Sequence, residues 1–116
     1  GKTLESSNPF PKRLKAARWE KGLTQQELGV KIGLDVGAAN SRMNHDENGR
    51  HAPDFETAKK IAAELDVPVT YFYCESDDIA EMLLSFHKLP KEQQQLVLEF
   101  IREQKNWLMS NNVYQD

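Results

Sequence analysis

The sequence predicts an all-α fold: a five-helix bundle that contains a helix-turn-helix, followed by a C-terminal helical extension. Apolar residues recur at the three- and four-residue spacing of amphipathic helices, as in Ile61, Ala62 and Leu65. Alternation of apolar and polar residues is scarce, and only the run VPVTYFY at 67–73 is rich in strand-forming residues. With 116 residues, 39% of them apolar, the chain suits one compact domain with a short appendage.

The first two helices are predicted from the signals at their ends. Prolines within 9–11 are tolerated in a first helical turn, and Gly22 is well placed as a C-terminal stop. Thr24 and Glu27 form the pattern of a capping box, which opens the second helix. Gly33 is expected to end that helix after about two turns.

A third helix is predicted over 36–46. Asp35 can cap its start, and Asn48 with Gly49 stops it. Two short helices joined by a tight turn, within a bundle, are the helix-turn-helix arrangement.

The second half of the chain predicts further helices. Residues 53–54 open a fourth helix with a strongly apolar face. Residues 70–74 form a short fifth helix, with a strand left open as the alternative. After a hinge at 76–78, two amphipathic helices follow, separated by a break at 89–90, and the last one covers about 91–107.

Charge is distributed unevenly along the chain. The net charge of −3 argues weakly against a nucleic-acid-binding protein. Residues 1–60, however, contain 11 Lys/Arg and 8 Asp/Glu (net +3), whereas residues 61–116 contain 4 and 10 (net −6). This asymmetry favours one surface for phosphates and another that faces away from them.

Several classes of function are disfavoured. A single cysteine, Cys74, excludes an internal disulfide framework and fits a reducing compartment, and we expect it to pack as a small apolar residue. No apolar run approaches a membrane span. We expect no metal, because His45 and His51 have no partners at ligand spacing and His87 lies far along the chain. We find no nucleophile–base pair or phosphate loop, so we expect neither an enzyme nor a cofactor. Trp19 is expected to pack within the first helix.

Three stretches together carry a resemblance to a known family. They are RLKAARWEKGLTQQELGVKIGLD, the stop at Glu47-Asn48-Gly49, and PDFETAKKIAAELDVPVTYFY. The segment 10–73 resembles the DNA-binding domains of lambda-type phage repressors and Cro proteins (the XRE-type regulators). The resemblance implies a lambda-repressor-like bundle that regulates transcription, as a repressor binding a palindromic operator as a homodimer, in the cytoplasm at the nucleoid.

The resemblance also implies contacts with DNA. Phosphate contacts fall on Thr24 and Gln25 at the start of the second helix, and on Asn48 and Arg50 after the stop. Base-reading positions fall on the third helix, which lies in the major groove in this family. They are Asn40, Ser41 and His45, with Ala39 at the tip facing a thymine methyl and Arg42 beside them, facing guanine or phosphate.

A scaffold pair is implied as well. Arg18 and Glu47 match a buried contact that pins the third helix to the first, so Glu47 should point inward. Two features depart from the family. Fifteen steps separate Leu34 from Gly49 instead of about eleven, so about one extra helical turn lengthens either the helix or the loop before it. Asp46 stands at an apolar position, so either the helix is rotated or Asp46 lies at a wet edge.

The C-terminal helices carry apolar stripes whose role is open. They either cover the domain's own core or form a dimer interface, and we expect the interface because paired domains bind two half-sites. Its candidate residues are Ile79, Met82, Leu83, Phe86, Leu96, Val97, Phe100 and Ile101.

The expected organisation has four segments. Residues 1–8 form a flexible arm or a cloning remnant, residues 9–75 the DNA-binding domain, residues 76–109 a helical dimerisation or interaction region, and residues 110–116 a tail. The expected partners are double-stranded DNA and a second copy, with a further protein partner possible through the C-terminal half and no membrane. Two alternatives remain: an antitoxin whose C-terminal half binds a toxin, and an interaction module with a lapsed DNA site.

Overall fold

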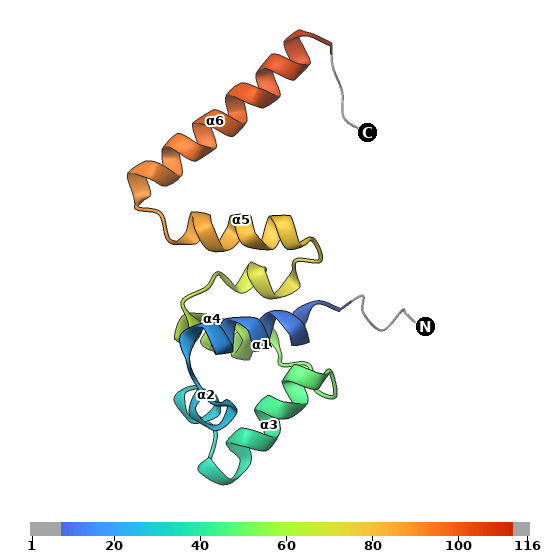
Figure 1. The fold of residues 1–116 in the computed structure, drawn as a ribbon, viewed down its shortest axis with the longest axis vertical. Helices are drawn as coiled ribbons and strands as arrows, with labels where there is room; N and C mark the ends of the chain where they lie inside the picture. Colours follow the sequence, from blue (N-terminus) through green and yellow to red (C-terminus); the bar gives the residue numbers. More distant parts are fainter. Residues whose placement is uncertain (1–7, 113–116) are drawn as a thin grey trace.

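The structure, a computed structural model, describes residues 8–112 (Figure 1). Its elements are α1 (Phe10–Lys21), α2 (Gln25–Lys31), α3 (Val36–Asn48), α4 (Phe55–Leu65), the 3-10 helix η2 (Val69–Tyr73), α5 (Asp77–His87) and α6 (Lys91–Ser110). The all-α prediction is confirmed, since none of the described residues lies in a strand. The expected arm over 1–8 and tail over 110–116 lie outside the described residues, except for residue 8 and residues 110–112.

Most helix ends follow the expected signals. Gly22 adopts a left-handed conformation with φ of 76° and ends α1, and Gly49 ends α3 with φ of 84°. The capping box at α2 is confirmed: the Thr24 hydroxyl accepts from the Glu27 amide, and the Glu27 carboxylate accepts from the Thr24 amide. Asp35 occupies the cap position of α3, but its side chain makes no capping hydrogen bond, so that prediction is wrong.

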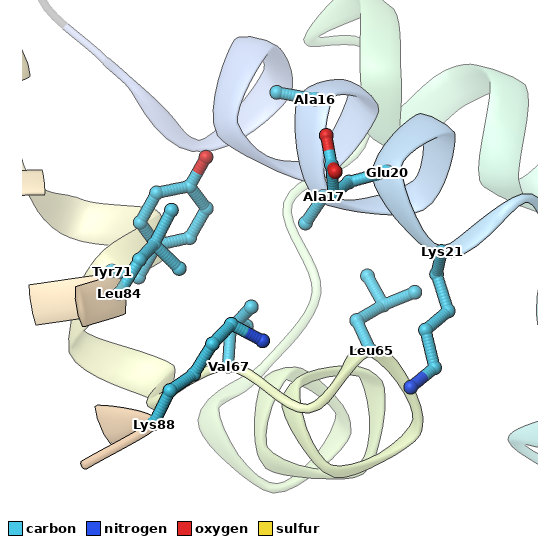
Figure 2. A pocket seen from close by; sticks show the side chains of 9 residues that line it. All are labelled: Ala16, Ala17, Glu20, Lys21, Leu65, Val67, Tyr71, Leu84 and Lys88. Carbon is cyan, nitrogen blue, oxygen red and sulfur yellow. The ribbon is translucent and has the colours of Figure 1, made fainter. Parts of the chain in front are cut away.

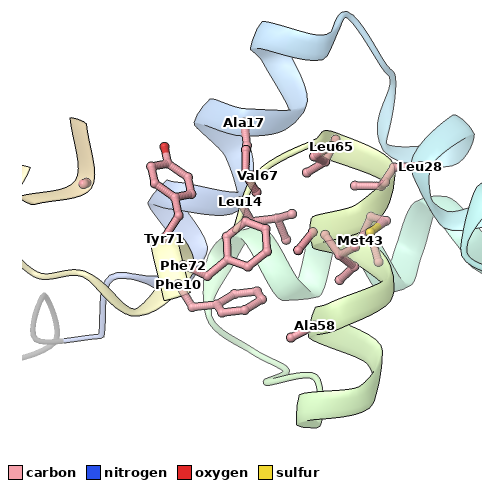
Figure 3. Close-up of a cluster of buried hydrophobic side chains, with 13 residues drawn as sticks. Phe10, Leu14, Ala17, Leu28, Met43, Ala58, Leu65, Val67, Tyr71 and Phe72 are labelled. Carbon is pink, nitrogen blue, oxygen red and sulfur yellow. The ribbon is translucent and has the colours of Figure 1, made fainter. Parts of the chain in front are cut away.

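The core is built from buried residues of α1, α2, α3, α4, η2 and α5 (Figure 3). The rings of Phe10 and Phe72 lie 4.9 Å apart, and Leu14 and Met43 are fully buried in the same cluster. Tyr71 and Phe72 are both buried although they are adjacent. Neighbouring residues of a strand point to opposite faces, so η2 buries more here as a helical turn than it could as a strand.

The helix α5 is tied to this bundle at both ends. At its start, Arg13 of α1 donates to the Cys74 carbonyl at 3.0 Å and pairs with Asp77 at 2.9 Å. At its end, the His87 Nε2 lies 3.2 Å from the Asp66 carboxylate, at the end of α4. These contacts fix α5 against the bundle.

The helix α6 projects away from the bundle (Figure 1). None of its residues is buried. The radius of gyration is 17.5 Å, whereas a compact chain of this length has about 13 Å. A 20-residue helix with no buried residue gains little from packing in the single chain.

Candidate nucleic-acid interface

The crossing of α2 and α3 is very close. A Cβ atom placed on Gly29 of α2 would lie 2.6 Å from the Cβ of Ala39 in α3. Ala39 is therefore fully buried, with 0% of its surface exposed. The expectation that Ala39 meets a thymine methyl is wrong, because this methyl group packs against α2.

The helix α3 is longer than the family pattern. It contains 13 residues and begins directly after Asp35, so the extra turn is helix and not loop. At 1.5 Å per residue it is about 20 Å long. Gly37 lies in its exposed first turn, where nothing lies within 4 Å of a Cβ placed on it. The observed end at Asn48 lies two residues beyond the expected end at 46.

The outward side of α3 is polar. Asn40, Ser41 and Arg42 are exposed, and His45 is half-buried. Asn44 is exposed as well. It shares a helix face with Ser41 and with Asn48 four residues later, a spacing from which the sequence could have added it to the base-reading candidates.

The inward side of α3 is held by a charged network. The Arg18 guanidinium donates to both carboxylate oxygens of Glu47, with the Nη2–Oε1 distance at 3.0 Å. Arg18 also donates to the Leu23 carbonyl at 2.8 Å, and Gln25 Nε2 donates to Glu47 Oε1 at 3.1 Å. Only 4% of the Glu47 side chain is exposed. The pair joins α1 to α3, and Glu47 points away from the outward face.

Asp46 is buried as well. Only 1% of its side chain is exposed, and its Oδ1 pairs with the Nδ1 of His51 in the loop after α3. Burial raises the pKa of the Asp46 carboxyl, although the hydrogen bond and charge of His51 and the charge of Arg42 lower it in part. Of the two alternatives for Asp46, the wet edge is wrong: the carboxylate is buried at this apolar position and pairs with His51.

The phosphate candidates surround the ends of α2 and α3. Thr24 is exposed but uses its hydroxyl as a cap, and Gln25 is half-buried and donates to Glu47. The Asn48 Oδ1 accepts a hydrogen bond from the Arg50 backbone amide at 3.0 Å. The side chain of Arg50, which follows Gly49, is exposed.

The candidate interface residues in the C-terminal helices are largely uncovered. Ile79, Met82, Leu96, Phe100 and Ile101 are exposed. Leu83, Phe86 and Val97 are half-buried. An apolar groove of about 360 Å³ lies between α5 and α6, and it is lined by Met82, Leu83, Ser85, Phe86, Leu89, Val97, Leu98 and Ile101.

A second hollow, of about 650 Å³, lies between α1, α4, η2 and α5 (Figure 2). Leu65, Val67 and Leu84 give it an apolar lining, and Lys21 and Lys88 stand at its rim. No residue of α2 or α3 lines this hollow, so it is separate from the polar face of α3.

Residues 8–112 also bear on metal binding and on membrane insertion. No group of three or more His, Cys, Asp or Glu side chains in this part of the chain is arranged to hold a metal ion. None of the helices in the same range combines the length and apolar character that crossing a membrane requires. Cys74 is free and half-buried, next to the core.

Comparison with known proteins shows which family the chain belongs to. Neither a protein-family model nor a curated protein matches it. Among solved structures, it is similar to the transcriptional regulator BswR, with a TM-score of 0.78 and 38% sequence identity. The match covers 81% of this chain and 93% of the BswR chain. This chain therefore belongs to the family of the transcriptional regulator BswR.

Proposed function

We propose that this chain is a sequence-specific, double-stranded-DNA-binding regulator of the lambda-repressor and Cro type, acting as a repressor. One observation carries the proposal: α3 presents an exposed polar side while Ala39, Met43 and Asp46 fix its other side. A rigid helix that offers amides, a hydroxyl and a guanidinium to its surroundings fits direct reading of base edges.

The proposed binding mode follows from this side of α3. The helix enters the major groove, where Asn40 bonds an adenine through two hydrogen bonds and Ser41 accepts several bases. His45 and Asn44 read the next positions along the groove. Arg42, on the flank of the helix, bonds a guanine or a phosphate.

Phosphate contacts fix the register of α3 in the groove. Thr24 and Gln25 lie at the start of α2, Asn48 is the last residue of α3, and Arg50 lies just beyond its end. Because Gln25 bonds Glu47 and Glu47 bonds Arg18, a phosphate contact at Gln25 is transmitted to the network that orients α3. Such contacts position the protein and carry no sequence information directly.

The regulator acts as a homodimer in this proposal, joined through α5 and α6. Phe100 is 60% exposed and Leu96 is 60% exposed, and soluble monomers rarely leave extended apolar patches uncovered. A second copy related by two-fold symmetry covers the stripe on both chains at once. It also presents two α3 helices to a palindromic operator with half-sites about 34 Å apart.

Selection from a pool of randomised DNA duplexes tests the function. The expected result is an enriched, palindromic motif whose two halves are about one helical turn apart. Enrichment of a motif without symmetry would contradict the dimer, and no enrichment at low salt would contradict DNA reading itself.

A second candidate function is an antitoxin, in which α5 and α6 bind a toxin. The exposed stripe and the acidic C-terminal half favour a protein partner of either kind. Light scattering after gel filtration separates the two: a dimeric mass supports the regulator, and a monomeric mass at high concentration favours the antitoxin.

A further inference from the structure

Trp19 lies in an unusual position. It is 69% exposed on α1, so the expectation that it packs within the first helix is wrong. A large aromatic ring gains free energy when it is covered, and nothing in the described chain covers this ring. The residues around Trp19 indicate what kind of partner could cover it.

Trp19 lines a shallow hollow of about 340 Å³ that is shared by three helices. Lys15 and Arg18 come from α1, Gln25 from α2, and Asn44, Glu47 and Asn48 from α3. Asn44 and Asn48 also lie on the outward polar side of α3. The hollow is therefore continuous with the proposed base-reading surface.

The hydrogen-bonding groups of this hollow favour an anion. Glu47, its one carboxylate, is neutralised by Arg18 and accepts from Gln25 as well. Lys15 is exposed, and within residues 8–112 neither its amino group nor the Trp19 indole N–H makes a hydrogen bond or salt bridge. The hollow thus offers an ammonium, an indole N–H and amide groups around a carboxylate that is already satisfied.

We propose that Trp19 is a contact for the DNA backbone, and that α1 thereby joins the DNA-binding surface. The indole ring lies against a deoxyribose, and its N–H donates to the adjacent phosphate, with Lys15 beside it. Sugar and phosphate present an apolar face next to an anion, which matches a ring with one polar end. A protein partner of the apolar kind fits less well, because the rim of the hollow is polar. This inference rests on the proposed function.

The two tryptophans of the chain allow a direct test. Trp107 lies on α6, is 59% exposed and does not line the hollow, so it is a matched reference. When tryptophan is excited selectively, only Trp19 emits in Trp107→Phe, and only Trp107 emits in Trp19→Phe. Each variant is titrated with a 20-base-pair duplex carrying the selected motif, or a random one at low salt, while the anisotropy of a dye on the duplex reports binding. Protein is kept at a concentration where its oligomeric state is constant.

The expected result is that duplex binding changes the Trp19 emission and protects it from acrylamide, while Trp107 is unaffected. Binding with Trp19 emission and quenching unchanged would overturn the Trp19 contact and leave the proposed function intact. No binding to any duplex would overturn the proposed function, and this inference with it.

Affinity gives a second measurement. Trp19→Ala loses both the hydrogen bond to a charged oxygen and the contact of the ring with the sugar, so it should weaken binding by at least about tenfold per half-site. Trp19→Phe also loses the N–H but keeps an aromatic ring against the sugar, so its affinity should lie between those of the parent protein and Trp19→Ala. Both variants should lower the affinity for all DNA sequences by the same factor, because the sugar-phosphate backbone of DNA carries no sequence information. Equal affinities for the three proteins would also overturn the contact; since Trp19 is exposed, folding is expected to survive both changes.

Discussion

Asp46 and His51 are joined by a hydrogen bond between the last turn of α3 and the loop that leads to α4. The carboxylate is almost completely buried, and its second oxygen, Oδ2, has no hydrogen-bond partner among the described residues. His51 is 39% exposed, so the pair connects the interior to the surface. The loop between them contains Arg50, a proposed phosphate contact. This hydrogen bond therefore links a buried group of α3 to the placement of that contact.

The buried carboxylate predicts a pH dependence of stability. Because burial raises the pKa of Asp46, the folded protein binds this proton more tightly than the unfolded chain does. This tighter binding stabilises the fold at low pH. The stabilisation is lost as the pH rises from the ordinary carboxyl pKa of 3.8 through the raised pKa of the folded state. Asp46→Asn cannot titrate, so its stability relative to the parent protein should increase with pH. Urea unfolding between pH 4 and 8, followed by circular dichroism, measures this.

Asp54→Asn is the matched control. Asp54 caps α4, and its hydrogen bonds with Thr57 lower the pKa of its carboxyl. Its stabilising effect is present at neutral pH and is lost as the pH falls, so the Asn variant should lose relative stability as the pH rises. If both variants showed the same sign of pH dependence, the raised pKa of Asp46 would be refuted.

Two glycines predict opposite effects of the same substitution. Gly37→Ala adds a methyl group in open space within a helix, so it should raise the free energy of unfolding by about 0.5–1 kcal/mol. Gly29→Ala places its methyl group 2.6 Å from that of Ala39, so α2 and α3 must separate. This should cost about 1–3 kcal/mol. Thermal unfolding of both variants compares them, and a neutral Gly29→Ala would mean that the helices do not cross this closely.

The Arg18–Glu47 pair predicts strong non-additivity. Glu47→Leu leaves a buried guanidinium without its partner and should destabilise the fold by about 3–5 kcal/mol. Arg18→Met in the same chain should recover much of this loss, because the unpaired charge is gone. A double-mutant cycle in urea measures the coupling. Additive effects would show that the two side chains do not stabilise the fold as a pair.

Local signals in the sequence predicted most of the fold. The capping box at Thr24 and Glu27 and the stops at Gly22 and Gly49 act over a few residues, so they can be read directly. The inward position of Glu47 came from the resemblance, because its partner is 29 residues away.

The wrong predictions depended on tertiary contacts. The resemblance places Ala39 at the tip of the base-reading set, whereas the close approach of Gly29 buries it against α2. The position of the Asp46 side chain could not be predicted, because its partner His51 reaches it only through a turn of the loop that follows α3. Trp19 is expected to pack within the first helix, but its position on α1 leaves it exposed.

The proposed DNA contacts predict two kinds of variant. Arg50→Ala should weaken binding to every DNA sequence by the same factor. It should also make the plot of log affinity against log salt concentration less steep, by the amount expected for about one phosphate contact. Asn40→Ala should change which base is preferred at one position in each half-site. Repeating the duplex selection with each variant, and measuring affinity at several salt concentrations, distinguishes them. An unchanged motif with Asn40→Ala would remove Asn40 from the base-reading set.

The stripe on α6 predicts how oligomeric state affects binding. Phe100→Glu places a charge in the middle of the proposed interface and should give a monomer, because burying an unpaired charge is costly. Gln95→Glu adds the same charge to an exposed polar position of the same helix and should leave the dimer intact. Light scattering measures the mass of both.

The same two variants separate dimerisation from DNA reading. The monomeric Phe100→Glu should lose affinity for a full palindrome, because two linked domains bind far more tightly than one. Its affinity for a single half-site should match that of Gln95→Glu, since α3 is held by α1 and α2 and not by α6. If Phe100→Glu remained dimeric, the two copies would meet through another surface. If it became monomeric and still bound the palindrome as tightly as the control, the operator would be read by one chain at a time.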